Sequence, residues 1–274
     1  MPRPHIEFIQ SQVLPWEPHP HLGLDAKVLS RDSESGAQSL VLRYPAGWSQ
    51  SGPAALAAAE EFLVLEGALT VCGVEFGRWS FGYVPAGATR TVAAGPAGAI
   101  VLSFFDRTPE SAQPAAGGTF TPDRIDIFDD GWDADYGGID SPELEAAGAR
   151  KKVLRNDPDA GDQTWLIGTL PLWRERKCET HPVVQEMFLL AGSIAGNAGI
   201  MHPGAYFWRP PDILHGPYGS KTGNLILMRS CGGALSTEYY DPDPPFRFDA
   251  PHVPVLPPEL EPLGRAPWSG TGIY

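Results

Sequence analysis

Residues 178–192, CETHPVVQEMFLLAG, place several possible metal ligands on a short segment that then becomes apolar. Two carboxylates, an imidazole and an amide are supplied within eight residues by Glu179, His181, Gln185 and Glu186. Because alternate side chains of a strand share a face, Glu179 and His181 would point in the same direction. Imidazole nitrogens and carboxylate oxygens bind divalent transition-metal ions. The spacing therefore indicates part of a metal site, with Gln185 and Glu186 both open as a further ligand.

The segment belongs to a sequence unit that occurs twice in the chain. Residues 27–48 match residues 152–173, and residues 60–67 match residues 185–192, both at a separation of 125 positions. The same separation relates Pro85 to Pro210, Arg90 to His215, and residues 98–104 to residues 223–229. A single separation that holds without a gap across so many turns indicates two copies of one unit.

Each copy has the pattern of an all-β unit. Short runs rich in Val, Leu, Ile, Phe and Tyr are separated by turns with Gly and Pro, which is typical of a sandwich or barrel. We expect an N-terminal barrel over 1–106, a linker over 107–149, a C-terminal barrel over 150–240 and a Pro-rich tail over 241–274. The tail is expected to wrap the surface or a neighbouring subunit.

One helix is expected in this β-rich chain. Residues 141–151, SPELEAAGARK, begin with Ser141 as a possible N-cap and Pro142 at the first helical position. The HPH sequence at 19–21 lies outside both copies among prolines. We expect it to be a loop and not a metal site.

Charge and composition exclude several classes of partner. The 274 residues carry a formal net charge of −13, with no run of Lys or Arg, so neither nucleic acid nor an anionic membrane is expected. No secretion signal or membrane-spanning segment is recognisable. Cys72, Cys178 and Cys231 are odd in number and widely spaced, which favours a reducing, cytoplasmic location.

The second copy resembles the cupin superfamily in its first motif. Cupins carry His-x-His, then Glu after three or four residues, and Gly after six more. Here Glu179-x-His181 is followed after three residues by Gln185, and after six more by Gly192. Glu179 thus replaces the usual first His, and Gln185 replaces the usual Glu.

The second cupin motif, Pro-x-Gly-x-x-His, is also recognisable. Pro210 and His215 occupy its ends, and Asp212 stands in place of its glycine. The resemblance covers both copies, residues 27–229, and implies two tandem cupin barrels of the double-stranded β-helix, or jelly-roll, type. Such a duplicated protein is a bicupin. Cupins are commonly dimers, so the resemblance also implies a homodimer.

The resemblance implies one divalent metal ion, bound in the C-terminal barrel. Fe2+ or Mn2+ is expected, with Zn2+ or Ni2+ as alternatives, and coordination positions would stay open for substrate or O2. The expected ligands are Glu179, His181, Gln185 and His215. Gln185 is preferred to Glu186 because of its spacing to Gly192, its match to Glu60, and a similar ligand position in bicupins of the ureidoglycine aminohydrolase type. Glu186 remains the alternative.

The first copy lacks these ligands. Ala54, Leu56 and Arg90 stand where the second copy has Glu179, His181 and His215, and only Glu60 could bind a cation. An unpaired buried carboxylate is unfavourable, so we expect Arg90 to pair with Glu60.

The expected function is that of a metal-dependent enzyme acting on a small molecule. The expected catalytic residues are Glu186 and Arg229, and the expected substrate-binding residues are Tyr206, Trp208 and Arg229, whose guanidinium could hold a carboxylate. A non-haem Fe(II) dioxygenase is preferred. The alternatives are a Mn(II)-type hydrolase or lyase resembling ureidoglycine aminohydrolase, and a non-catalytic sensor or binding protein resembling the cupin domains of anti-sigma factors.

Overall fold

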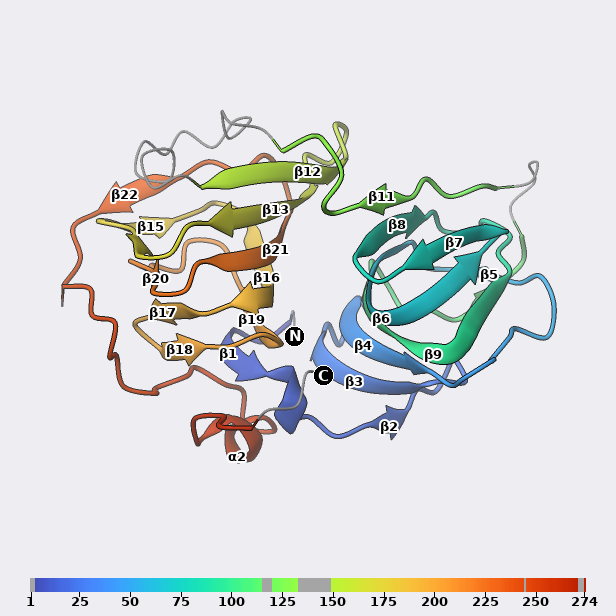
Figure 1. Ribbon diagram of the computed structural model, residues 1–274, viewed down its shortest axis with the longest axis horizontal. Helices are drawn as coiled ribbons and strands as arrows, with labels where there is room; N and C mark the ends of the chain where they lie inside the picture. Colours follow the sequence, from blue (N-terminus) through green and yellow to red (C-terminus); the bar gives the residue numbers. More distant parts are fainter. Residues whose placement is uncertain (1–2, 115–119, 133–148, 244, 271–273) are drawn as a thin grey trace. The chain divides into compact units, whose positions relative to one another are not determined.

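The chain forms two compact units. Its structure, a computed structural model, describes residues 3–114, 120–132, 149–243, 245–270 and 274. The first unit, here called the N-terminal barrel, contains Met1–Arg3 and Leu14–Asp129. The second unit, the C-terminal barrel, contains Pro4–Val13 and Asp130–Tyr274. Both are built almost entirely of β-strands, as the sequence predicts (Figure 1).

An eight-stranded sheet forms most of the N-terminal barrel. Its strand order is β11-β8-β6-β9-β4-β3-β2, with β7 paired to β6, and a separate pair joins β5 to β10. The strands are β2 (Glu17–Pro18), β3 (Asp25–Arg31), β4 (Gln38–Tyr44), β5 (Ala55–Leu56), β6 (Glu60–Val71), β7 (Val74–Gly77), β8 (Ser80–Val84), β9 (Val92–Phe105), β10 (Ser111–Ala112) and β11 (Ile125–Asp126).

The C-terminal barrel contains sheets of six, four and two strands. Their orders are β1-β19-β16-β21-β13-β12, β14-β20-β17-β18 and β15-β22. The strands are β1 (Ile6–Gln10), β12 (Arg150–Asn156), β13 (Gln163–Thr169), β14 (Trp173–Arg174), β15 (Cys178–Thr180), β16 (Val184–Gly192), β17 (Ile194–Gly196), β18 (Gly199–Met201), β19 (Ala205–Arg209), β20 (Gly219–Ser220), β21 (Asn224–Cys231) and β22 (Glu238–Tyr240).

The N-terminal strand belongs to the C-terminal barrel. β1 pairs antiparallel with β19, with Ile6 opposite Trp208 and Glu7 opposite Phe207, and its blue ribbon lies beside the later strands in Figure 1. Phe8 is 2% exposed and packs in that barrel's core. The expected N-terminal unit over 1–106 therefore differs from the observed one at its start, because residues 4–13 complete the edge of the other sheet.

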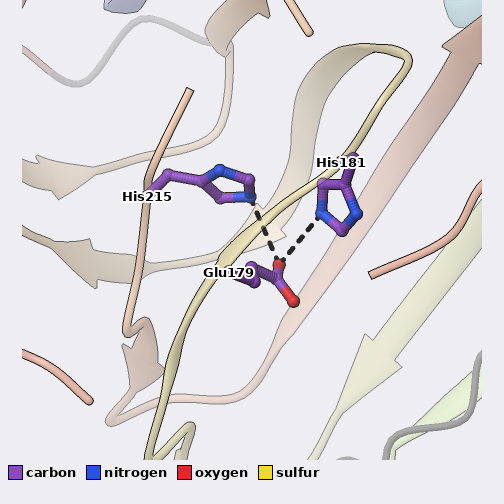
Figure 2. Close-up of side chains that lie close together, drawn as sticks. All are labelled: Glu179, His181 and His215. Carbon is purple, nitrogen blue, oxygen red and sulfur yellow. Dashed lines mark ion pairs between the residues drawn. The ribbon is translucent and has the colours of Figure 1, made fainter. Parts of the chain in front are cut away.

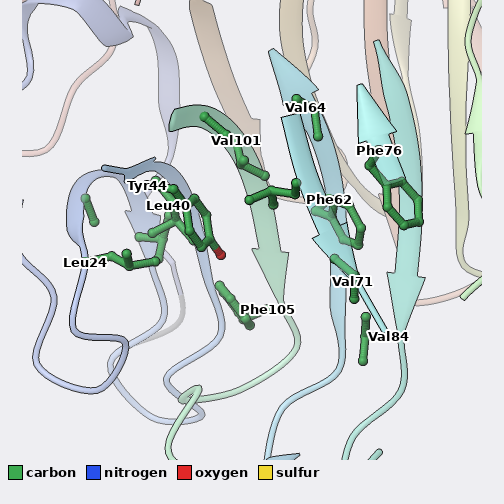
Figure 3. Packing of buried hydrophobic residues seen from close by; sticks show 14 of the residues in the cluster. Leu24, Leu40, Tyr44, Phe62, Val64, Val71, Phe76, Val84, Val101 and Phe105 are labelled. Atoms are coloured by element: carbon green, nitrogen blue, oxygen red, sulfur yellow. The ribbon is translucent and has the colours of Figure 1, made fainter. Parts of the chain in front are cut away.

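Buried apolar side chains fill the N-terminal barrel. In β6, Phe62 and Val64 point into this core, and β9 contributes Val101 and Phe105 (Figure 3). The rings of Phe62 and Phe76 pack edge to face, with their centroids 4.9 Å apart. Full burial of each such side chain is worth about 1.5–3 kcal/mol, so these alternating residues stabilise the barrel.

The core of the C-terminal barrel shows which side chains face inward. Met187 and Leu189 of β16 pack against Phe207 of β19 and against Ile226 and Met228 of β21. These residues occupy alternate positions on their strands. The residues between them consequently face the other side of the sheet.

The two barrels have the same strand register. Glu60 of β6 pairs with Val84 of β8, and Gln185 of β16 pairs with Arg209 of β19. All of these positions correspond at the separation of 125 residues that relates the two copies. The sequence repeat is thus a repeat of strand pairing.

Glycines occupy equivalent positions of the two strands, Gly67 within β6 and Gly192 at the end of β16, for the same steric reason. Gly67 and Gly192 have φ values of 71° and 77°. A Cβ atom at either would lie 2.0 Å from the carbonyl oxygen of Gly98 or Gly223, respectively. Asp212, which replaces the motif glycine, also has a positive φ, 63°, a conformation that Asp tolerates better than most residues.

The remaining segments pack around these sheets. The tail lies along the C-terminal barrel, where Val255 forms a β-bridge with Glu7 and α2 (Glu261–Gly264) follows. The helix expected over 141–151 lies outside the described residues except for its end, where Arg150 and Lys151 begin β12. Among the described residues, no helix has the length and apolar character needed to span a bilayer.

Candidate metal centre

Three side chains with metal-binding groups meet in the C-terminal barrel. Glu179 in β15 forms an isolated antiparallel bridge with His215, with N–H···O distances of 2.9 and 3.0 Å in the two directions. His181 follows directly after β15. One ligand atom from each of the three side chains lies within 4.8 Å of the other two (Figure 2). Three of the four expected ligands therefore converge on one point.

Backbone carbonyls hold both imidazoles in the tautomer that metal binding requires. Nδ1 of His181 lies 2.9 Å from the Ser236 carbonyl oxygen, and Nδ1 of His215 lies 2.8 Å from that of Ile213. Because a carbonyl oxygen only accepts, each Nδ1 carries a hydrogen, and Nε2 is the nitrogen that can bind a metal ion when the ring is neutral. Ligating histidines commonly donate their other N–H in this way.

The free nitrogens face the carboxylate. Nε2 of His181 and Nε2 of His215 lie 3.4 and 3.3 Å from Oε1 of Glu179. Both Nε2 atoms are buried, and neither makes a hydrogen bond to any described residue. Two buried imidazole nitrogens turned towards one carboxylate oxygen fit a divalent metal ion.

The protonation states also suit a cation. Burial alone would raise the pKa of the Glu179 carboxyl, but the imidazoles of His181 and His215 hold it well below its ordinary range. Burial and the nearby Arg209 guanidinium lower the pKa of His215. Glu179 is therefore ionised and His215 neutral near pH 7, which are the forms that bind metal.

The three residues line a cavity of about 730 Å³, a volume that includes space open to solvent. Its walls are mainly apolar and come from β13, β16, β19 and β21: Trp165, Ile167, Met187, Phe207, Ile226 and Met228. A largely apolar cavity with a few convergent polar groups is typical of a small-molecule site.

Gln185 lines the same cavity, where an arginine holds its amide oxygen. Arg209 Nη1 donates to Gln185 Oε1 at 2.7 Å. The remaining edge of this guanidinium donates to Glu7, from Nε at 2.8 Å and from Nη2 at 2.6 Å, and Nη2 also donates to the Tyr218 hydroxyl at 2.6 Å. An amide oxygen has a second lone pair. Ligation by Gln185 therefore stays a prediction.

Glu7, Arg209 and Tyr218 are site residues that the sequence prediction missed. Burial would raise the pKa of Glu7, but the charge of Arg209 holds it well below its ordinary range. The guanidinium charge is therefore balanced beside the metal site. Arg209 could have been recognised, because its counterpart in the first copy is the core residue Val84. Nothing in the local sequence of Glu7 indicates that it reaches a site about 200 residues later.

The expected catalytic and substrate-binding residues lie elsewhere. Glu186, Arg229, Tyr206 and Trp208 do not line the cavity, because on their strands Gln185, Met187, Phe207 and Met228 face it. The first three of them form a group of their own, in which the buried Glu186 accepts hydrogen bonds from the Tyr206 hydroxyl and from Nη1 of the half-buried Arg229, at 2.5 and 2.6 Å. The expected catalytic and substrate-binding residues therefore lie outside the cavity that holds the three metal-binding side chains.

The N-terminal barrel has an ion pair at the equivalent place. Arg90 Nη1 donates to Glu60 Oε2 at 2.5 Å, and both side chains are buried. The expectation that Arg90 pairs with Glu60 is confirmed. Among the described residues, the only cluster of three or more His, Cys, Asp or Glu side chains with metal-site spacing is the one in the C-terminal barrel.

Solved structures define the class of fold. One from Nostoc punctiforme, described as a "putative dioxygenase", matches with a TM-score of 0.73 at 18% identity, covering 88% of this chain and 92% of the other. Oxalate decarboxylase from Bacillus subtilis matches with a TM-score of 0.55 at 12% identity, covering 85% and 78%. At these identities the likeness establishes the fold, which is of the cupin type.

The family is defined by sequence. The sequence model of the family described as "Domain of unknown function (DUF4437)" matches residues 23–237, which is most of the chain. The chain belongs to this family. None of the curated proteins matches it in sequence. Since one fold can serve many reactions, the function must be argued from the site itself.

Proposed function

We propose that the protein is a metal-dependent bicupin enzyme, a non-haem Fe(II) dioxygenase acting on a small carboxylate-bearing substrate in the C-terminal barrel. One observation carries the proposal: two imidazoles and one carboxylate converge in a mainly apolar cavity. Two histidines and one carboxylate are the ligand set of many non-haem Fe(II) oxygenases. The likeness to a "putative dioxygenase" supports this choice over other reactions.

The residues of the chain would have distinct tasks. Glu179, His181 and His215 would hold the ion, and the carbonyls of Ser236 and Ile213 keep the two imidazoles oriented. When bound, Fe2+ supplies a Lewis-acidic redox centre with open positions for substrate and O2. The apolar walls limit access of water and favour an apolar substrate body.

No free arginine is required to hold the substrate carboxylate. Arg209 lines the cavity, but its hydrogen bonds to Glu7, Gln185 and Tyr218 already use most of its donors. We therefore expect the metal to bind the carboxylate, and Arg209 to position Gln185.

Metal analysis and oxygen consumption test the proposal. Protein purified without added metal is expected to hold about one equivalent of a divalent ion. Fe2+-loaded protein should consume O2 with some members of a panel of small carboxylates. Turnover that persists under strict anaerobiosis would exclude a dioxygenase. Absence of both metal and turnover would favour the non-catalytic alternative.

A second candidate is a Mn(II)-type hydrolase or lyase. The observation that favours it is a further carboxylate in the cavity, Glu175, which accepts a hydrogen bond from the Tyr218 backbone N–H at 2.8 Å. Glu175 could transfer a proton, the role expected of Glu186 from the sequence. Anaerobic turnover that falls at least about 100-fold in Glu175→Gln, with metal content unchanged, would support this candidate.

The assembly and location are further proposals. A homodimer is expected, and sedimentation of the purified protein tests it. A cytoplasmic location is consistent with three cysteines that form no disulfide.

A further inference from the structure

The N-terminal barrel contains a cavity of its own, of about 660 Å³ including space open to solvent. It lies at the place that corresponds to the metal-site cavity of the other barrel, since Ala54, Leu56, Glu60 and Arg90 all line it. Apolar and aromatic side chains make up most of the remaining wall: Leu22, Leu24, Leu42, Tyr44, Trp48, Val92 and Phe105.

Both carboxylate oxygens of Glu60 in this cavity accept a hydrogen bond, but two nitrogens of Arg90 do not donate one. Glu60 accepts from Arg90 at Oε2 and from the Ser103 hydroxyl at Oε1, at 2.5 and 2.8 Å. Arg90 is 5% exposed, and its Nε and Nη2 atoms are buried without a hydrogen-bond partner among the described residues. Leaving a buried donor unpaired is unfavourable.

The two unpaired nitrogens of Arg90 have the arrangement that binds a carboxylate. Nε–H and Nη2–H form the side edge of the guanidinium, which matches the two oxygens of a carboxylate. Glu60 is bound at the other nitrogen, Nη1, and leaves this edge without a hydrogen-bond partner among the described residues. Glu60 balances the charge of Arg90, so a ligand would be held mainly by paired, charge-assisted hydrogen bonds.

We propose that the N-terminal barrel binds a small carboxylate with an aromatic or branched apolar body, held at its carboxylate by Nε and Nη2 of Arg90. The apolar wall, with Trp48 and Phe105, would pack against the body. Gln50, whose side-chain nitrogen donates to the carbonyl oxygen of Gly52 at 2.8 Å, also lines the cavity and offers a further polar contact. The site is separate from the metal centre and does not depend on the proposed enzyme activity.

Benzoate is a suitable probe, with benzamide as an uncharged ligand of the same shape. The full chain carrying His215→Ala, treated with chelator, removes binding at the metal centre from the measurement. Isothermal titration and ligand-observed NMR should detect benzoate, with benzamide bound at least about tenfold more weakly. Equal binding of the two would overturn the assignment of a carboxylate, and no binding of benzoate at 10 mM, about the weakest useful affinity, would overturn the site.

Two variants locate the ligand. Arg90→Lys keeps a cation beside Glu60 but removes the side edge, so benzoate affinity should fall at least about tenfold. Leu56→Trp fills the cavity and leaves the ion pair intact, so it should abolish binding. Arg43→Lys changes an exposed arginine that pairs with Asp25 and should have no effect. Unchanged affinity in both cavity variants, each with an unchanged thermal unfolding temperature, would overturn the proposal.

Discussion

The two barrels place different chemistry on the same backbone. Ala54 bridges to Arg90 in the N-terminal barrel, and Glu179 bridges to His215 in the C-terminal barrel, each through two N–H···O bonds of 2.8–3.0 Å. One barrel consequently presents a guanidinium to a buried carboxylate, and the other presents an imidazole to a carboxylate. The strand framework determines where these side chains start, and the residue type alone determines what they bind.

Glu60 and Gln185 occupy equivalent strand positions in the two barrels, and each is bound by an arginine. The two arginines come from different positions of the repeat. Arg90 reaches Glu60 from the position that His215 occupies in the other copy. Arg209 reaches Gln185 from β19, at the position of Val84. Because the arginine of the C-terminal barrel lies on β19, position 215 is available for a histidine that can bind a metal ion.

The largest effect is expected from removing a ligand of the C-terminal site. His215→Ala should abolish stoichiometric metal binding and any metal-dependent activity, because it removes one of three convergent donors. Mass spectrometry of the metal content after gel filtration measures this. His202→Ala removes a histidine that does not line the cavity and is the control. A full metal equivalent in His215→Ala would rule out the site.

The converse experiment builds the ligand set into the N-terminal barrel. Ala54→Glu, Leu56→His and Arg90→His together should raise the metal content from one equivalent to two, because the equivalent bridge already exists. The same protein without Leu56→His supplies two of the three groups and should bind more weakly. If the folded triple variant still holds one equivalent, backbone equivalence is insufficient and further residues of the C-terminal barrel are required.

Breaking the ion pair tests its structural role in the N-terminal barrel. Arg90→Met should lower the free energy of unfolding by about 3–5 kcal/mol, because it leaves Glu60 as an uncompensated buried charge. Adding Glu60→Gln should recover most of this loss, since the charge is then gone. Urea unfolding followed by tryptophan fluorescence measures both variants. Equal stability of the single and double variants would mean that the unpaired charge of Glu60 is not the cause of the loss.

The fourth ligand can be decided by comparing neighbours on β16. Gln185→Ala should weaken metal binding by about tenfold if its amide oxygen coordinates the ion. Glu186→Gln should leave the affinity unchanged, because Glu186 does not line the cavity. Competition with a chelator of known affinity gives both values. The opposite result would show that Glu186 is the ligand.

The smallest effect is expected from the N-terminal strand. Glu7→Gln removes the charge that balances Arg209, so an excess positive charge would remain near the metal site. We expect metal affinity to fall by several-fold, up to about tenfold. Glu17→Gln, an exposed glutamate in β2, is the control. An unchanged affinity would indicate that Arg209 acts only on the packing of the barrel.

The sequence alone predicted the all-β fold, the repeat and the Arg90–Glu60 pair. These follow from features that act over short range or repeat regularly. Alternation along a strand determines which residues share a face, and Gly67 and Gly192 are required where a Cβ atom would strike a carbonyl oxygen. Three of the expected ligands also meet because two matching motifs placed them on paired backbone segments.

Alternation could have separated Gln185 from Glu186 more fully than the sequence prediction did. If Gln185 faces the cavity, its neighbour must face away, together with the partners opposite it on β19 and β21, Trp208 and Arg229. Tyr206 lies two positions before Trp208 and shares its face of the sheet. Alternation along the strands is therefore sufficient to place all four expected catalytic and substrate-binding residues on the side away from the cavity.

Only the tertiary structure decided the contribution of the N-terminal strand. Glu7 bonds to Arg209 across 202 positions, and no local pattern distinguishes strand β1 as an edge of the C-terminal barrel. Such pairings depend on which sheet edge is free and which core accepts Phe8, and these are properties of the packed barrel. The sequence determined the face of each side chain, whereas long-range packing determined its neighbours.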